Sequence, residues 1–111
     1  ICMIESADTV KNELDAMLKV DGVDVFFVGP NDLAQSMGYT SFTPYGLEPP
    51  ADVDEMVERA LGKISAAGKV GGTLTKADRL NHWLQKGARF IYYHSDPILR
   101  QGISAFQAQL R

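Results

Sequence analysis

One stretch of ten residues decides the fold of this chain: Asp24-Val25-Phe26-Phe27-Val28-Gly29-Pro30-Asn31-Asp32-Leu33. After the aspartate come four apolar residues, two of them β-branched and two aromatic, so the segment is apolar on both faces. That pattern is typical of a strand buried in a parallel sheet, and we predict a strand over 24–28. Gly29-Pro30 ends the strand, and a proline here is well placed to begin a short helix, which we predict over 31–37. Strand, tight turn and helix together form the repeating unit of an α/β fold.

Three more segments repeat this strand–helix unit. We predict further strands over 1–5, 70–75 and 89–93, and helices over 7–19, 51–67, 76–86 and 97–110. All four of these helices carry apolar residues at helical spacing. They are Val10, Leu14, Met17 and Leu18 in the helix over 7–19; Val53, Met56, Val57, Ala60, Leu61 and Ile64 in the helix over 51–67; Ala77, Leu80, Trp83 and Leu84 in the helix over 76–86; and Leu99, Ile103, Phe106 and Leu110 in the helix over 97–110. Residues 38–50 show no period and are predicted as a loop, either a solvated connector or a functional, oligomer-contacting excursion.

Four successive strand–helix units predict parallel strands joined by right-handed crossovers. Two architectures fit this pattern, namely a complete open four-stranded sheet and half of a (β/α)₈ barrel, which usually takes about 250 residues. An open nucleotide-binding sheet would favour a glycine-rich loop after its first strand, but that strand leads into Glu5-Ser6-Ala7-Asp8. The chain is strand-like from Ile1 and has no initiator methionine. We therefore expect residues 1–111 to form one partial barrel domain, with the other half of the barrel absent.

Composition and charge limit the classes of function. The chain has 111 residues, of which 45% are hydrophobic and 23% charged, values that are ordinary for a soluble globular domain. Eleven Lys and Arg residues against 14 Asp and Glu residues give a formal net charge of −3, so we expect neither nucleic acid nor a membrane as partner. The single cysteine, Cys2, excludes an internal disulfide and fits a reducing compartment, so a cytoplasmic location is predicted.

Two carboxylates follow neighbouring strands of the predicted sheet. Glu5 ends the strand over 1–5, and Asp32 follows the strand over 24–28. Because neighbouring strands lie about 5 Å apart, both side chains can reach one small volume at the carboxyl ends of the strands. Two carboxylates there repel one another unless a proton or a cation lies between them. The pair therefore predicts either a Mg²⁺ or Mn²⁺ site or two acids that favour helix N-termini.

The turn after the second strand adds a second feature to this site. Gly29 allows close backbone approach, Pro30 fixes the helix start, and the amides of Asn31 and Asp32 then point out of the first helical turn. Such amides bind a carboxylate or a phosphate. A carboxylate-binding turn beside a divalent cation suits a 2-oxo acid.

Several segments, in their order and spacing, resemble the HpcH/HpaI aldolase/citrate lyase family. They are Met3-Ile4-Glu5-Ser6, Val20-Asp21-Gly22-Val23-Asp24, Val28-Gly29-Pro30-Asn31-Asp32-Leu33-Ala34-Gln35-Ser36-Met37-Gly38, Ala66-Ala67-Gly68-Lys69 with Gly72 and Leu74, and Gly87-Ala88-Arg89-Phe90-Ile91. The resemblance covers essentially the whole chain. It corresponds to strands five to eight of the family's TIM barrel.

The resemblance implies a metal-dependent (class II) aldolase that reversibly cleaves 4-hydroxy-2-oxo acids to pyruvate and an aldehyde. Carried over to this sequence, Glu5 and Asp32 would be the metal ligands, for Mg²⁺ or Mn²⁺ with Co²⁺ as a further candidate. The substrate-binding residues would be Gly29, Pro30, Asn31, Asp32 and Leu74, the last as a wall on the aldehyde side. The family's arginine and its histidine–aspartate pair belong to the first half, so the catalytic residues are unknown here. The resemblance also implies a homo-oligomer with a swapped C-terminal helix.

One segment departs from the family pattern. After the fourth strand the family usually has an apolar residue followed by Gly-x-Asp, whereas this chain has Tyr92-Tyr93-His94-Ser95-Asp96. The histidine and two tyrosines add bulk near the top of the barrel, which puts the aldehyde specificity in doubt. His94 is either a base that titrates near neutrality or simply a polar residue at a strand end.

Two alternative functions stay open at this point. One is an acyl-CoA lyase of the same family, of the citramalyl-CoA type. The other is a non-catalytic half-barrel, a fragment or an assembly module that pairs with the missing half through its unpaired strand edges. In the aldolase reading, the 111-residue chain alone is expected to be inactive.

Overall fold

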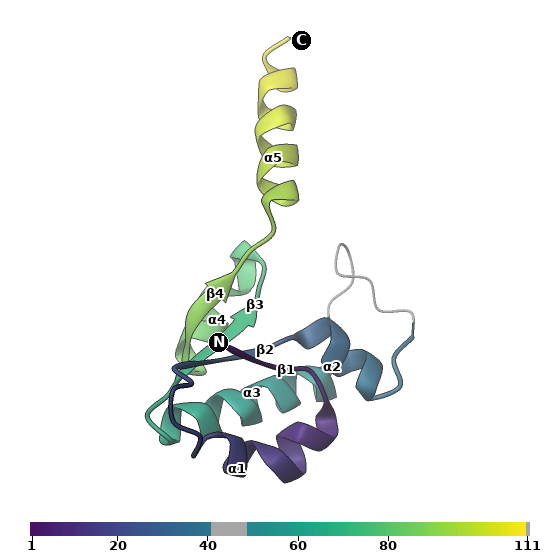
Figure 1. The fold of residues 1–111 in the computed structure, drawn as a ribbon. Helices are drawn as coiled ribbons and strands as arrows, with labels where there is room; N and C mark the ends of the chain where they lie inside the picture. The colour runs from purple at the N-terminus through teal and green to yellow at the C-terminus, as the bar shows by residue number, and fades with distance from the viewer. Residues whose placement is uncertain (41–48, 111) are drawn as a thin grey trace.

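The computed structural model describes residues 1–40 and 49–110, which form a single parallel sheet with helices. Its strands, in sequence and in spatial order, are β1 (Cys2–Ile4), β2 (Val25–Val28), β3 (Val70–Leu74) and β4 (Ala88–Tyr92). Each strand pairs in parallel with the next, and Met3, Phe27 and Gly72 lie side by side across the first three. The predicted set of four parallel strands, each followed by helical structure, is confirmed (Figure 1).

The helices lie close to their predicted ranges. They are a π-helical turn η1 (Thr9–Glu13) with α1 (Leu14–Met17), α2 (Pro30–Ser36), α3 (Ala51–Ala66), a 3-10 turn η2 (Ala77–Arg79) with α4 (Leu80–Gln85), and α5 (Ser95–Ala108). The first predicted helix is therefore not a regular α-helix throughout, because one wide turn interrupts it. Most of the predicted loop over 38–50 lies outside the described residues. No helix in the described part of the chain combines the length and the apolarity that crossing a membrane requires.

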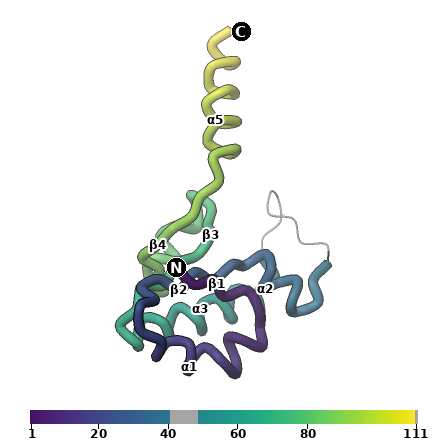
Figure 2. The backbone as a smooth tube through the Cα atoms, in the orientation of Figure 1, coloured from purple at the N-terminus to yellow at the C-terminus, as the bar shows by residue number. Residues whose placement is uncertain are grey.

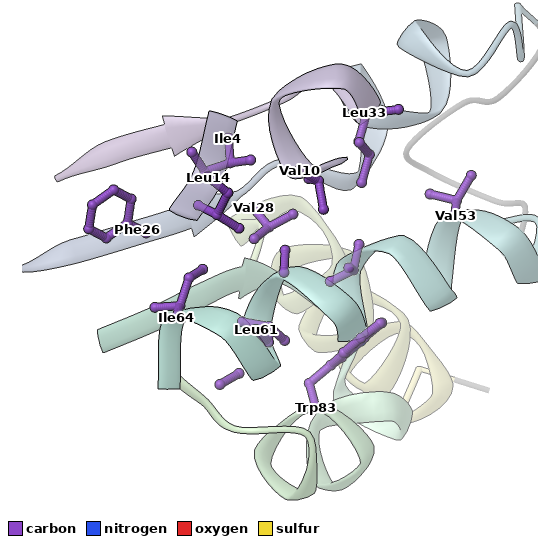
Figure 3. Packing of buried hydrophobic residues seen from close by; sticks show 14 of the residues in the cluster. Ile4, Val10, Leu14, Phe26, Val28, Leu33, Val53, Leu61, Ile64 and Trp83 are labelled. Atoms are coloured by element: carbon purple, nitrogen blue, oxygen red, sulfur yellow. The ribbon is translucent and has the colours of Figure 1, made fainter. Parts of the chain in front are cut away.

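A hydrophobic core fills the space between one face of the sheet and the helices (Figure 3). Ile4, Phe26 and Val28 point from the strands toward this core, and each is at most 1% exposed. The helices contribute Val10, Leu14, Val53, Val57, Ala60, Leu61, Ile64 and Trp83 to the same cluster. The predicted stripe of α3 is confirmed, with Met56 packed at its edge.

The predicted inward face of the helix over 76–86, which the structure forms as η2 and α4, was partly wrong. Trp83 is buried at 3% exposure, and Leu80 is half-buried, but Ala77 and Leu84 are exposed. Ala77 lies in a 3-10 turn, which has three residues per turn and thereby shifts the phase of the inward face. The Arg79 guanidinium lies over the Trp83 ring at 5.1 Å from its centroid and pairs with the Asp54 carboxylate at 2.7 Å.

The opposite face of the sheet carries large apolar side chains that are exposed. Met3 is 54%, Phe90 38% and Tyr92 48% exposed, although all three lie within strands. A complete open α/β sheet has helices on both faces, whereas the inner face of a barrel strand meets only other strands. The single covered face is therefore that of a half-barrel, as expected from the sequence, and the uncovered face is the barrel interior.

The last helix, α5, extends away from the sheet (Figures 1 and 2). None of its residues is buried, and the predicted stripe of Leu99, Ile103, Phe106 and Leu110 is between 57% and 73% exposed. The extents of the chain, 57 × 29 × 21 Å, reflect this elongated arrangement.

Gly72 lies in close contact with the neighbouring strand β4. A Cβ atom at this position would lie 2.7 Å from the Phe90 carbonyl oxygen and 2.9 Å from the Phe90 Cβ. We expect Gly72→Ala to destabilise the fold by about 1–3 kcal/mol, because β3 and β4 must move apart. Urea unfolding checks this, with Gly62→Ala as the matched control because a Cβ there meets nothing within 4 Å. Equal stability of the two variants would show that the strands are not held this closely.

Candidate functional site

A cavity of about 390 Å³ lies on the uncovered face of the sheet, at the carboxyl ends of the strands. Every predicted site residue lines it: Glu5, Gly29, Pro30, Asn31, Asp32 and Leu74. The remaining lining residues are Ile1, Met3, Phe27, Phe90, Tyr92 and His94. The structure thus brings together residues from all four strands at the end where parallel α/β folds bind ligands.

The turn after β2 positions the polar end of this cavity. The Gly29 amide donates to the Ile4 carbonyl at 2.9 Å, which joins the ends of β1 and β2. Gly29 is also the N-cap of α2, and Pro30 occupies its first turn. The Leu33 amide donates to the Gly29 carbonyl at 3.0 Å and begins the helix. The amides of Asn31 and Asp32 have no acceptor within the helix, because they precede its first hydrogen bond.

Glu5 lies directly against this turn. A Cβ atom at position 29 would be 3.1 Å from Glu5 Oε1 and 3.2 Å from Glu5 Cγ. The Gly29 backbone has φ −87° and ψ 101°, which any residue can adopt. Glycine is therefore needed here for the space it leaves to the Glu5 carboxylate, and not for its backbone freedom.

The carboxylates of Glu5 and Asp32 interact with one another. Partial burial raises the pKa of Glu5, and the negative charge of Asp32 and a side-chain hydrogen bond with Asp32 raise it further. Two acids that share one site favour either a proton or a cation between them. Within the described residues no group of three or more His, Cys, Asp or Glu side chains could hold a metal ion, so a cation at this point would have only these two carboxylates to bind. Oxygen pairs of this kind suit Mg²⁺ or Mn²⁺, which keep several positions for water and substrate.

The raised pKa of Glu5 has a consequence for stability. A carboxyl group that binds its proton more tightly in the folded state costs stability as the pH rises through its folded pKa. We expect Glu5→Gln to raise the Tm at pH 7 in EDTA, since the amide removes the repulsion and keeps a donor for Asp32. The gain should vanish below about pH 4, the range where an ordinary glutamate is itself protonated. Thermal unfolding at several pH values checks this, and a lower Tm for Glu5→Gln at pH 7 would contradict it.

The rest of the cavity wall is apolar and aromatic. The Phe27 ring packs edge-on against Phe90 and Tyr92, with centroids 6.1 and 6.4 Å apart. Leu74 lies on this wall, whereas Thr73 is fully buried on the other face and donates to the Val28 carbonyl at 3.0 Å. Sequence reasoning had not placed Met3, Phe27 or Phe90 at the site. Strand alternation contained that signal for two of them, because Phe27 lies between Phe26 and Val28, which face the core, and Met3 directly precedes Ile4, which also faces it.

The segment Tyr92–Asp96, which departs from the family pattern, lies only partly at the cavity. Tyr92 and His94 line the cavity, whereas Tyr93 is not among the lining residues. The Tyr92 hydroxyl lies 3.4 Å from His94 Nδ1. The other histidine, His82, lies on the outer helical layer, 3.2 Å from a Glu58 carboxylate oxygen. Cys2 is half-buried at the edge of the core.

Comparisons with known proteins agree with this geometry. The HpcH/HpaI aldolase/citrate lyase family matches residues 1–99. A hydroxypyruvate/pyruvate aldolase of Agrobacterium fabrum is 39% identical over 99 residues, which are 86% of this chain and 35% of the relative. A 2-keto-3-deoxy-L-rhamnonate aldolase of Klebsiella pneumoniae is 35% identical over 103 residues, 89% of this chain and 35% of that relative. The chain thus spans about a third of the length of both curated relatives.

A solved structure gives the same result for the fold. The chain superimposes on a family protein of Burkholderia cenocepacia with a TM-score of 0.78 and 28% identity. The match covers 98% of this chain and 41% of that protein.

Proposed function

The chain belongs to the HpcH/HpaI aldolase/citrate lyase family, and from this premise we propose that its cavity is part of the active site of a divalent-metal-dependent aldolase. The reaction is the reversible cleavage of a 4-hydroxy-2-oxo acid to pyruvate and an aldehyde. The observation that carries the proposal is the meeting of Glu5 and Asp32 at one end of a cavity whose central wall is apolar. The relatives' names, which include pyruvate aldolases, support the same chemistry.

The donor set fits Mg²⁺ or Mn²⁺, with Co²⁺ as a further candidate. A cation between Glu5 and Asp32 would offset the repulsion between their two carboxylates. The open cavity leaves room for water and substrate oxygens as its other ligands. The chemistry that a bound cation supplies is Lewis-acid polarisation of the 2-oxo group, which favours the negative charge that develops on that oxygen. Glu5 and Asp32 would hold it, and Gly29 leaves the space for Glu5.

The other lining residues bind and orient the substrate. The free first-turn amides of Asn31 and Asp32 would donate hydrogen bonds to the pyruvate carboxylate beside the cation. Phe27, Leu74 and Phe90 line the cavity between β2 and β4 and would exclude water from the carbon–carbon bond that breaks. The resemblance places the family's arginine and histidine–aspartate pair outside strands five to eight. Proton transfer is therefore assigned to residues beyond the part of the barrel described here.

The assembly of the protein is part of the proposal. The exposed apolar stripe of α5 is suited to packing on another subunit, which agrees with a homo-oligomer.

Pyruvate release tests the proposed function directly. The natural protein that carries these 111 residues should release pyruvate from a 4-hydroxy-2-oxo acid when Mn²⁺ or Mg²⁺ is present, and EDTA should abolish the release. The isolated chain should show no turnover, because the residues for proton transfer come from elsewhere in the barrel. Metal-independent release, or release only from an acyl-CoA ester such as citramalyl-CoA, would contradict the proposal. Robust turnover by the isolated chain would contradict the division of the site between two halves.

A further inference from the structure

The cavity is polar at both ends and apolar between them. Glu5, Asn31 and Asp32 form the end that follows β1 and β2. Tyr92 and His94 are the polar residues of the end that follows β4, and Phe27 and Leu74 lie on the wall that separates the two. A ligand that fits this cavity has a charged group at the end near Glu5, Asn31 and Asp32. It has carbon atoms against the apolar wall, and a hydrogen-bonding group at the end near Tyr92 and His94.

Tyr92 and His94 contact one another through both their polar atoms and their rings. The hydroxyl lies 3.4 Å from Nδ1, and the two rings meet edge to face with centroids 5.0 Å apart and planes at 85°. On its other side the Tyr92 ring meets Phe27 edge-on at 6.4 Å. These contacts fix the ring of Tyr92 from two sides, so its hydroxyl stays at the rim of the cavity. Nδ1 of His94 can accept a hydrogen bond from the Tyr92 hydroxyl. The lone pairs of the Tyr92 oxygen then remain available to accept a hydrogen bond from a ligand hydroxyl.

The distance across the sheet decides which part of a substrate meets this pair. Two strand spacings separate β2 from β4, about 10 Å in a flat sheet. A substrate whose carboxylate lies on the amides after β2 therefore reaches Tyr92 only through its far carbons. In a 4-hydroxy-2-oxo acid those carbons derive from the aldehyde.

We propose that Tyr92, positioned by His94, hydrogen-bonds a hydroxyl on the aldehyde-derived end of the substrate and so selects hydroxylated aldehydes over their deoxy counterparts. The inference rests on the proposed aldolase function and deepens it by naming the aldehyde class. Tyr92 is the contact residue, and His94 acts through it as a positioning residue.

Competition between two aldehydes that differ in one hydroxyl tests this. The assay supplies the natural protein with pyruvate, Mn²⁺ and either 2-hydroxypropanal or propanal. The ratio of the two kcat/KM values for condensation is measured. We expect the wild type to favour 2-hydroxypropanal about tenfold, the effect of one net hydrogen bond, and Tyr92→Phe to bring the ratio close to one. Phenylalanine keeps the ring contacts with Phe27 and His94, so this variant isolates the hydroxyl.

Three further variants separate positioning from general structure. His94→Leu should lower the ratio, because the tyrosine hydroxyl loses its partner, whereas His94→Asn keeps an acceptor and should restore part of it. Tyr93→Phe is the matched control, since Tyr93 is not a lining residue, and it should leave the ratio as in the wild type.

The two proposals fail in different ways. No metal-dependent turnover with either aldehyde would overturn the proposed function and this inference together. Turnover with a ratio that Tyr92→Phe leaves unchanged, or that Tyr93→Phe lowers equally, would overturn the inference alone.

Discussion

Asp32→Asn in the natural protein is expected to lower kcat/KM for pyruvate release about a thousandfold. Loss of a charged ligand removes Lewis-acid stabilisation of several kcal/mol, and each 1.4 kcal/mol corresponds to about a factor of ten in rate. Asparagine keeps the size of the side chain and its place in the first turn of α2. Glu5→Gln should have an effect of the same order, because the two carboxylates act on one cation.

The control for this loss is an acid outside the cavity. Asp15 is 69% exposed and pairs with Lys63 at 2.8 Å on the helical layer. Asp15→Asn should leave kcat/KM within about twofold of the wild type, because exposed ion pairs contribute little. If Asp32→Asn behaved like Asp15→Asn, the carboxylate pair would not be part of the active site.

Gly29→Ala should weaken Mn²⁺ binding about 10- to 100-fold, the loss typical when the support of a metal ligand is disturbed. The added Cβ would lie 3.1 Å from Glu5 Oε1, so the carboxylate must turn away from Asp32 or the turn must shift. The backbone angles of Gly29 suit alanine, so the overall fold should be kept. Isothermal titration with Mn²⁺ measures the affinity, and circular dichroism checks the fold.

Gly62→Ala is the matched control for this variant. Gly62 lies within α3, and a Cβ there meets nothing within 4 Å. Alanine is the better helix former, so Gly62→Ala should keep the Mn²⁺ affinity and slightly raise stability. Equal Mn²⁺ affinity in Gly29→Ala and Gly62→Ala would mean that the position of Glu5 against Gly29 does not matter for binding.

The order of the elements was predictable from the sequence because the local signals agree. The apolar run over 25–28 has strand character, and Gly29-Pro30 marks its end without ambiguity. The stripe of α3 follows the helical period from Val53 to Ile64, about three turns, so its inward face could be named residue by residue. Where a local signal was weaker, as at Ala77, a tighter 3-10 turn changed which side chains face inward.

The candidate site was predictable in part for the same reason. Strand ends gather at one edge of a parallel sheet, so the proximity of Glu5 and Asp32 followed from topology alone. The contact of Glu5 with the Gly29 backbone did not, because it depends on the path of a side chain across a turn. The pairing of Tyr92 with His94 likewise depends on how β4 ends and α5 begins, and spacing does not fix this.

Binding of Mn²⁺ to the carboxylate pair tests the central claim most directly. Electron paramagnetic resonance of free Mn²⁺ gives the number of ions bound per chain in the wild type, in Glu5→Gln/Asp32→Asn, and in the control Asp15→Asn. We predict one ion per chain at this site in the wild type and in Asp15→Asn, and its loss in the double variant. Unchanged Mn²⁺ binding by Glu5→Gln/Asp32→Asn would contradict the assignment of the cavity as a metal-dependent aldolase site.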